Sequence, residues 1–172
     1  MLIKFKRIPA FVLVLLLFVF ISGCDQNKQT ETTAKIEAIE YGDECFICGM
    51  EIKRFPGPKG QALLHHSAHP IKFCSSNELL GWLLQPDTPG VLHSAYVHDM
   101  GKATSWATPN DDYYIDVKKA WYVIGHSQKG AMGVSLASFT KKQDAQKFKN
   151  DFGGRLIGYS EIDNQMLINS SP

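Results

Sequence analysis

Three sulfur-containing side chains occur within six residues, in Cys45-Phe46-Ile47-Cys48-Gly49-Met50. If residues 49–52 begin a strand, Cys48 and Met50 lie on the same face, because side chains alternate along a strand. A thiolate and a thioether are soft ligands, which favour Cu(I) over harder ions. The stretch therefore predicts a copper site in a binding protein rather than in an enzyme.

The C-x-x-C pair leaves three other interpretations open. Structural zinc takes four nitrogen or sulfur ligands, so Cys74 and a histidine would have to complete such a set. A thiol redox motif opens a helix, whereas the Pro-Gly-Pro at 56–58 disfavours a helix here. A Cys45–Cys48 disulfide used only as a staple is the third alternative. We interpret Cys74 as a buried small apolar side chain rather than a ligand.

A second group of candidate donors lies in the His-Asp-Met-Gly segment at 98–101. In a strand His98 and Met100 share a face, so an imidazole and a thioether would converge on the thiolates. We expect an accessible site between the Cys48/Met50 strand and the Met100 strand. Met132, which lies between two glycines, is a weaker candidate, with packing in the second half as its alternative.

The histidines just before Cys74 have a simpler interpretation. His65, His66 and His69 fall in an expected turn and read as solvent-facing residues, although a surface histidine pair also binds Cu(II) or Zn(II) adventitiously.

Composition limits the classes of function. The 172 residues are 44% hydrophobic and 20% charged, which is typical of a globular chain of one domain or two small ones. A net charge of +1 provides no basic patch, so nucleic acid is not an expected partner. The sequence has no phosphate-binding glycine loop, Ser-His-Asp order or paired-carboxylate motif, which argues against common enzyme classes.

The first 23 residues have the layout of a signal peptide: a basic start, an apolar run at 11–20 and small residues before Cys24. Ile-Ser-Gly-Cys at 21–24 resembles a bacterial lipobox, so we expect cleavage before Cys24, its lipidation and a flexible tether over 24–42. An uncleaved anchor helix is the alternative. With Cys24 lipidated, three cysteines remain, an odd number that cannot all pair, which favours metal binding.

The remaining chain predicts an α+β fold of two tandem ββαβ units. The first unit spans 43–102, a linker spans 103–119, and the second unit spans 120–165. Ser75 with Glu78, and Thr140 with Gln143, have the spacing of capping boxes that open the two helices, which end before Pro86 and near Phe152. A single mixed α+β domain is the alternative.

Taken together these residues resemble the NosL family, the accessory lipoproteins of nitrous oxide reductase. The resemblance covers Cys45 to about Glu161. It is carried by the lipobox, Cys45-x-x-Cys48-Gly49-Met50, Val-His-Asp-Met-Gly-Lys at 97–102, Tyr-Ile-Asp at 114–116, Ala-Trp-Tyr-Val-Ile-Gly-His at 120–126 and Gly-Ala-Met-Gly at 130–133. It implies two homologous ββαβ domains, similar in topology to part of the organomercurial lyases.

The resemblance also implies a function. It indicates a periplasmic metallochaperone that is anchored to a membrane by acylated (palmitate-bearing) Cys24, binds Cu(I), and delivers it to nitrous oxide reductase through a copper-site assembly transporter during denitrification. The positions that match are Cys45, Cys48, Met50 and Met100. Two alternatives are a thiol or organomercurial-lyase-like enzyme and a structural zinc module that recruits partners. Asp25 resembles an inner-membrane retention signal.

Overall fold

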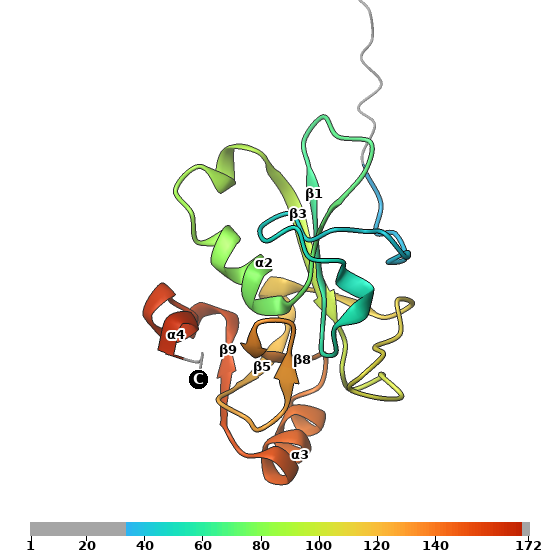
Figure 1. Ribbon diagram of the computed structural model, residues 1–172. Helices are drawn as coiled ribbons and strands as arrows, with labels where there is room; N and C mark the ends of the chain where they lie inside the picture. Colours follow the sequence, from blue (N-terminus) through green and yellow to red (C-terminus); the bar gives the residue numbers. More distant parts are fainter. Residues whose placement is uncertain (1–33, 170–172) are drawn as a thin grey trace, which may run out of the picture. The chain divides into compact units, whose positions relative to one another are not determined.

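The computed structural model describes residues 34–169, which form two antiparallel sheets and the helices packed on them (Figure 1). The first sheet has the strand order β2-β1-β3-β4, with β1 Gly60–Leu64, β2 Ile71–Phe73, β3 Leu92–His98 and β4 Tyr114–Asp116. The second has the order β8-β5-β9, with β5 Trp121–Ile124, β8 Ala137–Phe139 and β9 Arg155–Gly158. A hairpin of β6 (Lys129–Gly130) and β7 (Gly133–Val134) lies between β5 and β8 in the chain.

Helices complete both halves. They are α2 (Ser76–Leu83) between β2 and β3, α3 (Lys142–Phe152) between β8 and β9, and α4 (Asn164–Asn169) at the end. Short 3-10 turns occupy Ile52–Arg54, Thr88–Gly90, Val117–Lys119 and Tyr159–Glu161. The predicted α+β class with two ββαβ units is confirmed by the order β1-β2-α2-β3 and by β5-β8-α3-β9. Strand β4 lies in the segment for which the sequence predicts only a linker, and it pairs with β3.

One core joins the two sheets. Strand β5 alternates, because Tyr122 and Ile124 face the main core whereas Val123 packs with α3 in a second cluster. The main core also contains Phe73 and Val97 from the first sheet. Since side chains of both sheets share it, residues 34–169 fall within one compact unit.

The two predicted capping boxes differ in outcome. Ser75 caps α2 as expected, since its side chain accepts a hydrogen bond of 3.1 Å from the Glu78 N–H. The box at Thr140 was wrong: the Thr140 hydroxyl donates to Asp99 Oδ2 at 2.7 Å, and α3 begins at Lys142 without a side-chain cap. The Thr140 hydroxyl therefore binds the distant Asp99 side chain instead of capping its own helix.

Residues 98–100 hold the two sheets together at the end of β3. Met100 N–H donates to the Ser138 carbonyl at 2.8 Å, and the Ser138 hydroxyl donates to the His98 carbonyl at 2.6 Å. The buried Asp99 carboxylate accepts from the backbone N–H groups of Gly101 and Thr140 and from the Thr140 hydroxyl. The segment from which copper ligands were expected is thus a connection between the sheets.

Replacing Asp99 by alanine should lower the free energy of unfolding by about 3 kcal/mol, because the partners of a buried carboxylate are left unsatisfied. Urea unfolding of the full-length chain measures the change. Asp112, which is exposed, is the matched control, and Asp112→Ala should change stability by less than about 0.5 kcal/mol. Equal effects of the two substitutions would contradict the structural role of Asp99.

Candidate metal centre

The C-x-x-C segment is a tight turn rather than the start of a strand. Gly49 N–H donates to the Cys45 carbonyl and Cys45 N–H to the Met50 carbonyl, both at 2.9 Å. Gly49 has φ +70°, a left-handed conformation that glycine adopts without steric cost. The expected strand at 49–52 is wrong, since only Glu51 makes an isolated bridge, to Glu44, before the 3-10 turn begins.

A backbone hydrogen bond places this turn against the end of β2. Phe46 N–H donates to the Lys72 carbonyl at 2.9 Å. Cys74 follows β2 directly and precedes Ser75, the N-cap of α2, so its position is set by a strand on one side and a helix on the other. The turn and the strand end thereby bring thiols from two segments of the chain to one place.

The thiols of Cys45, Cys48 and Cys74 form one cluster. Their Sγ atoms all lie within 4.8 Å of one another, with Cys48 and Cys74 at 3.6 Å. A metal about 2.3 Å from each of three sulfurs requires sulfur–sulfur distances of about 3.8–4.0 Å. Among residues 34–169, no other three His, Cys, Asp or Glu side chains gather in this way. The cluster thus needs only small shifts to coordinate one ion.

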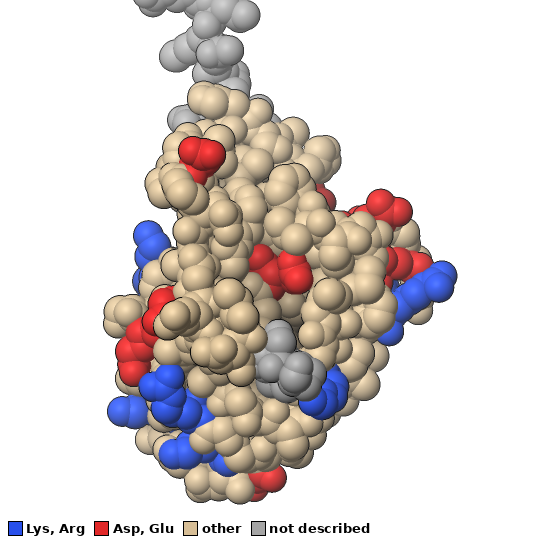
Figure 2. All heavy atoms as spheres, turned by 60° about the vertical axis from the view of Figure 1, so that its left-hand side comes forward, with Lys and Arg blue, Asp and Glu red and all other residues tan. Residues whose placement is uncertain are grey.

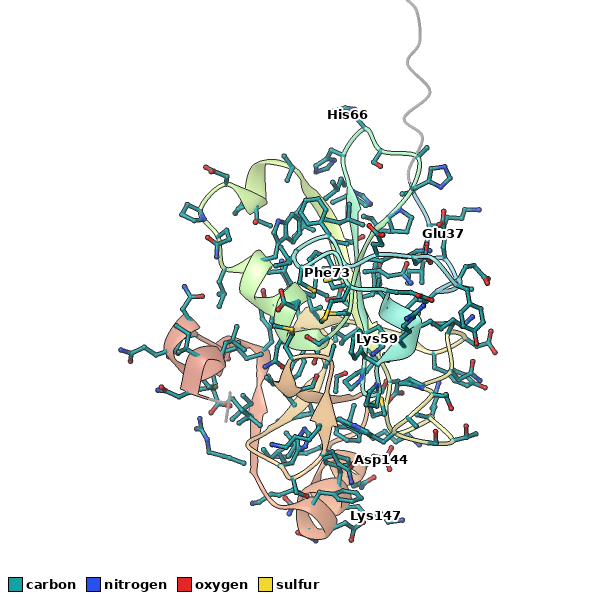
Figure 3. All side chains as sticks on the ribbon, in the orientation of Figure 1. Glu37, Lys59, His66, Phe73, Asp144 and Lys147 are labelled. Carbon is teal, nitrogen blue, oxygen red and sulfur yellow. The ribbon has the colours of Figure 1, made fainter. Side chains whose placement is uncertain are left out.

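Access to the cluster is one-sided. Cys45 is 3% exposed and Cys74 fully buried, whereas Cys48 is exposed. Sulfur atoms gather in the middle of the molecule below the labelled Phe73 in Figure 3. An ion would therefore enter and leave past Cys48.

The protons of the cluster are distributed unequally. The Cys74 thiol donates to Cys45, and with N–H groups of Cys74, Cys48 and Ile47 this lowers the pKa of Cys45 to about 4 despite its burial. The same contact and burial raise the pKa of Cys74 far above its usual value. The metal-free cluster thus holds a thiolate at Cys45 and a thiol at Cys74.

A buried lysine and a glutamate adjoin this charge. Lys59 is 4% exposed, and its ammonium donates to the carbonyls of Phe55 and Pro56 at 2.7 and 2.9 Å. Burial lowers the pKa of Lys59 to about 8, while the neighbouring cysteines and Asp111 act in the opposite direction. Burial, and then the charge of Cys45, raise the pKa of Glu78 at the start of α2. Lys59 therefore compensates part of the negative charge of the Cys45 thiolate.

The structure gathers some of the predicted ligands. Cys45 and Cys48 lie in the cluster, and Met50 packs against the buried group of Ile39, Cys45, Ile52 and Cys74. Met100 instead packs in the second cluster, with Val123 and Phe139 among others. The two methionines thus belong to different parts of the core.

The weaker candidates are placed as follows. His98 uses both ring nitrogens, since Nδ1 accepts from the Lys59 N–H at 3.1 Å and Nε2 lies 3.0 Å from Asp111 Oδ1. Met132 is exposed, and its neighbour Ala131 packs against the thiol cluster. Cys24 lies outside the described residues.

Cys74 was interpreted from the sequence as a buried apolar side chain, and as a ligand only in the zinc alternative. Its burial is as expected, but its sulfur contacts the thiol of Cys48. The odd number of cysteines was the available signal, because it left one thiol to join the C-x-x-C pair.

An α+β chain with three converging thiols, one of them exposed, has the donor set of a soft-metal-binding protein. No helix within residues 34–169 combines the length and apolar character needed to cross a bilayer. The chain belongs to the NosL family, whose model matches residues 35–167.

Named relatives agree with this assignment. The chain is 44% identical to a copper-binding lipoprotein NosL of Stutzerimonas stutzeri, over 94% of this chain and 84% of the relative. It is 28% identical to the protein of the same name in Achromobacter cycloclastes, over 92% and 82%. The crystal structure of the copper chaperone NosL from Shewanella denitrificans matches with a TM-score of 0.72 and 41% identity, covering 76% of this chain and 97% of that one.

The Cys45 thiolate should make the stability of the reduced, metal-free chain depend on pH. The pKa of Cys45 is about 4 in the folded chain and about 9.0 for an unperturbed thiol, so between these values the unfolded chain binds more protons. The stabilisation is complete above the unfolded pKa and is lost as pH falls through the folded pKa. Unfolding free energies measured by urea between about pH 6.8 and 8 should fall on acidification, by at most about 1.4 kcal/mol per pH unit.

The control is Cys48→Ser, since Cys48 is the exposed thiol. The Cys48→Ser variant should show the same change in unfolding free energy per pH unit as the unchanged chain, whereas Cys45→Ser should show a smaller change. An identical slope in Cys45→Ser would contradict the presence of a thiolate at this position.

Proposed function

We propose that this protein binds Cu(I) and delivers it for the assembly of nitrous oxide reductase. The convergence of three thiols, two buried and one exposed, is the observation that carries the proposal. The relatives named copper-binding lipoprotein and copper chaperone support it. The activity is binding and transfer of an ion, without turnover of a substrate.

The ligands fit Cu(I) for chemical reasons. Thiolates and thioethers select Cu(I) over the harder divalent ions. We propose Cys45, Cys48 and Cys74 as ligands, with Met50 beside them as a further soft donor. The candidate donors from the sequence also include Met100, which packs in the second cluster and is therefore tested separately.

Delivery requires that the ion leave its site readily. The exposed Cys48 is the ligand that an incoming donor group of a partner reaches first. Exchange then proceeds one ligand at a time, from Cys48 to the two buried thiols. The buried ligands provide retention, and the exposed one provides a route for release.

The surface around Cys48 suits a protein partner. Phe46 and Ile47, the two residues before Cys48, are 54% and 48% exposed. A groove of about 640 Å³ beside them is lined in part by Ile47, Trp82 and Met132. Figure 2, which turns the side of α2 and α4 forward, shows mostly neutral side chains, with acidic ones near the centre of the face, and Glu78 lines the groove. We propose that nitrous oxide reductase or its copper-site assembly transporter docks here.

We further propose that lipidated Cys24 anchors the protein to a membrane facing the bacterial periplasm. This position would keep the thiol cluster at the membrane where the transporter operates. The lipoprotein names of the two curated relatives support an anchor of this kind.

A Cu(I) titration under anaerobic conditions, against a calibrated chromophoric competitor, tests the proposed ligands. The full-length chain should bind one Cu(I), and Cys48→Ser or Cys74→Ser should weaken the affinity at least about tenfold. Met100→Leu should leave the affinity unchanged, because Met100 packs away from the cluster.

Three outcomes would overturn the proposal. Wild-type affinity in Cys48→Ser and Cys74→Ser would exclude the thiol cluster. One equivalent of zinc after anaerobic purification, without exchange for Cu(I), would identify a structural zinc site. Turnover of an organomercurial would identify an enzyme.

A further inference from the structure

Three histidines lie close together where β1 ends and β3 begins. His65 and His66 follow β1 directly, and His93 is the second residue of β3. The pairing of the strands brings them together, since Leu64 pairs with Leu92 and His65 N–H donates to the Val91 carbonyl at 2.9 Å. The third histidine of this cluster is thus His93, from a different strand, rather than His69.

Two of the ring pairs have the spacing of ligands on one metal. The ring centres of His65 and His93 lie 5.3 Å apart, and those of His65 and His66 lie 6.2 Å apart. A metal about 2.0 Å from an imidazole nitrogen is about 3.2 Å from the ring centre, so two such rings have centres roughly 4.5–6.4 Å apart. The nitrogens are not yet turned to one point, but all three side chains are exposed and free to rotate.

The backbone also holds His66 in an unusual conformation. His66 has φ +63°, and it is the only non-glycine residue of 34–169 with positive φ. This left-handed conformation is uncommon for residues with a side chain, although histidine tolerates it better than most. It places the His66 ring next to the His65 ring, instead of on the opposite face as in a continued strand. The strained residue thus contributes to the cluster.

The surroundings leave these rings available. Within the described residues, His65, His66 and His93 have contacts with one another's rings but no hydrogen bond or ion pair through their side chains. His69 differs, because its Nδ1 lies 2.8 Å from Glu37 Oε1.

The cluster is separate from the thiols. In Figure 3 the labelled His66 lies at the tip of the turn after β1, well away from Phe73 and the sulfur atoms at the centre. The chemistry differs as well, since imidazoles bind borderline divalent ions, and Cu²⁺ has the highest affinity of that series. We propose that His65, His66 and His93 form a second metal site, which binds Cu(II).

Electron paramagnetic resonance of the full-length Cys48→Ser protein tests this site, because among residues 34–169 this variant removes the exposed thiol, which Cu(II) would reach first. One equivalent of Cu(II) should bind with nitrogen hyperfine structure. His65→Gln or His93→Gln should weaken binding at least about tenfold. These residues are exposed, so circular dichroism should show an unchanged fold.

The matched control is His69→Gln, which removes an equally exposed histidine nearby and should leave Cu(II) affinity unchanged. Equal weakening by all three substitutions would mean adventitious surface binding and overturn the proposal, as would wild-type affinity in His65→Gln and His93→Gln. Neither result bears on the Cu(I) titration, because that measurement depends on the cysteines.

Discussion

The candidate metal centre depends on the hydrogen bond from Phe46 N–H to the Lys72 carbonyl. It fixes the C-x-x-C turn against β2, so that a thiol 26 residues further along the chain reaches Cys48. Each side of this contact is rigid for its own reason. The turn closes on Gly49, and Cys74 lies between a paired strand and a capped helix. The cluster is therefore organised by backbone bonds before any metal arrives, which lowers the entropy cost of binding.

The electrostatics of the cluster follow from this preorganisation. Three thiols close together and mostly buried cannot all ionise, so Cys45 holds the charge while Cys74 keeps its proton. An ion bound by all three must displace the remaining protons, and its affinity therefore depends on pH. The buried Lys59 near the thiolates reduces the cost of the added negative charge. The same residues thus set both the resting state of the cluster and its readiness for a cation.

The sequence predicted what depends on local patterns. Alternating strands, the Ser75 cap and the order of the two ββαβ units were all visible in it, because they follow from period and from capping chemistry. What it missed depends on tertiary neighbours. Thr140 has the spacing of a cap, but Asp99 binds its hydroxyl. Met100 follows His98 in the pattern of a strand, but β3 ends at His98, and the Met100 N–H donates to Ser138 of the second sheet. Cys74 is apolar in character and joins the site only because β2 ends beside the turn.

The hydrogen bonds that residues 98–100 make to the second sheet have a consequence for how the two halves respond together. Ser138 and Thr140 of the second half bond to His98 and Asp99, and the main core contains side chains of both sheets. Neither half can open without exposing core surface of the other, so we expect the described part of the chain to melt in one cooperative transition. An ion captured by the cysteines would then raise the melting temperature of the second sheet as well, although that sheet supplies none of the proposed thiol ligands.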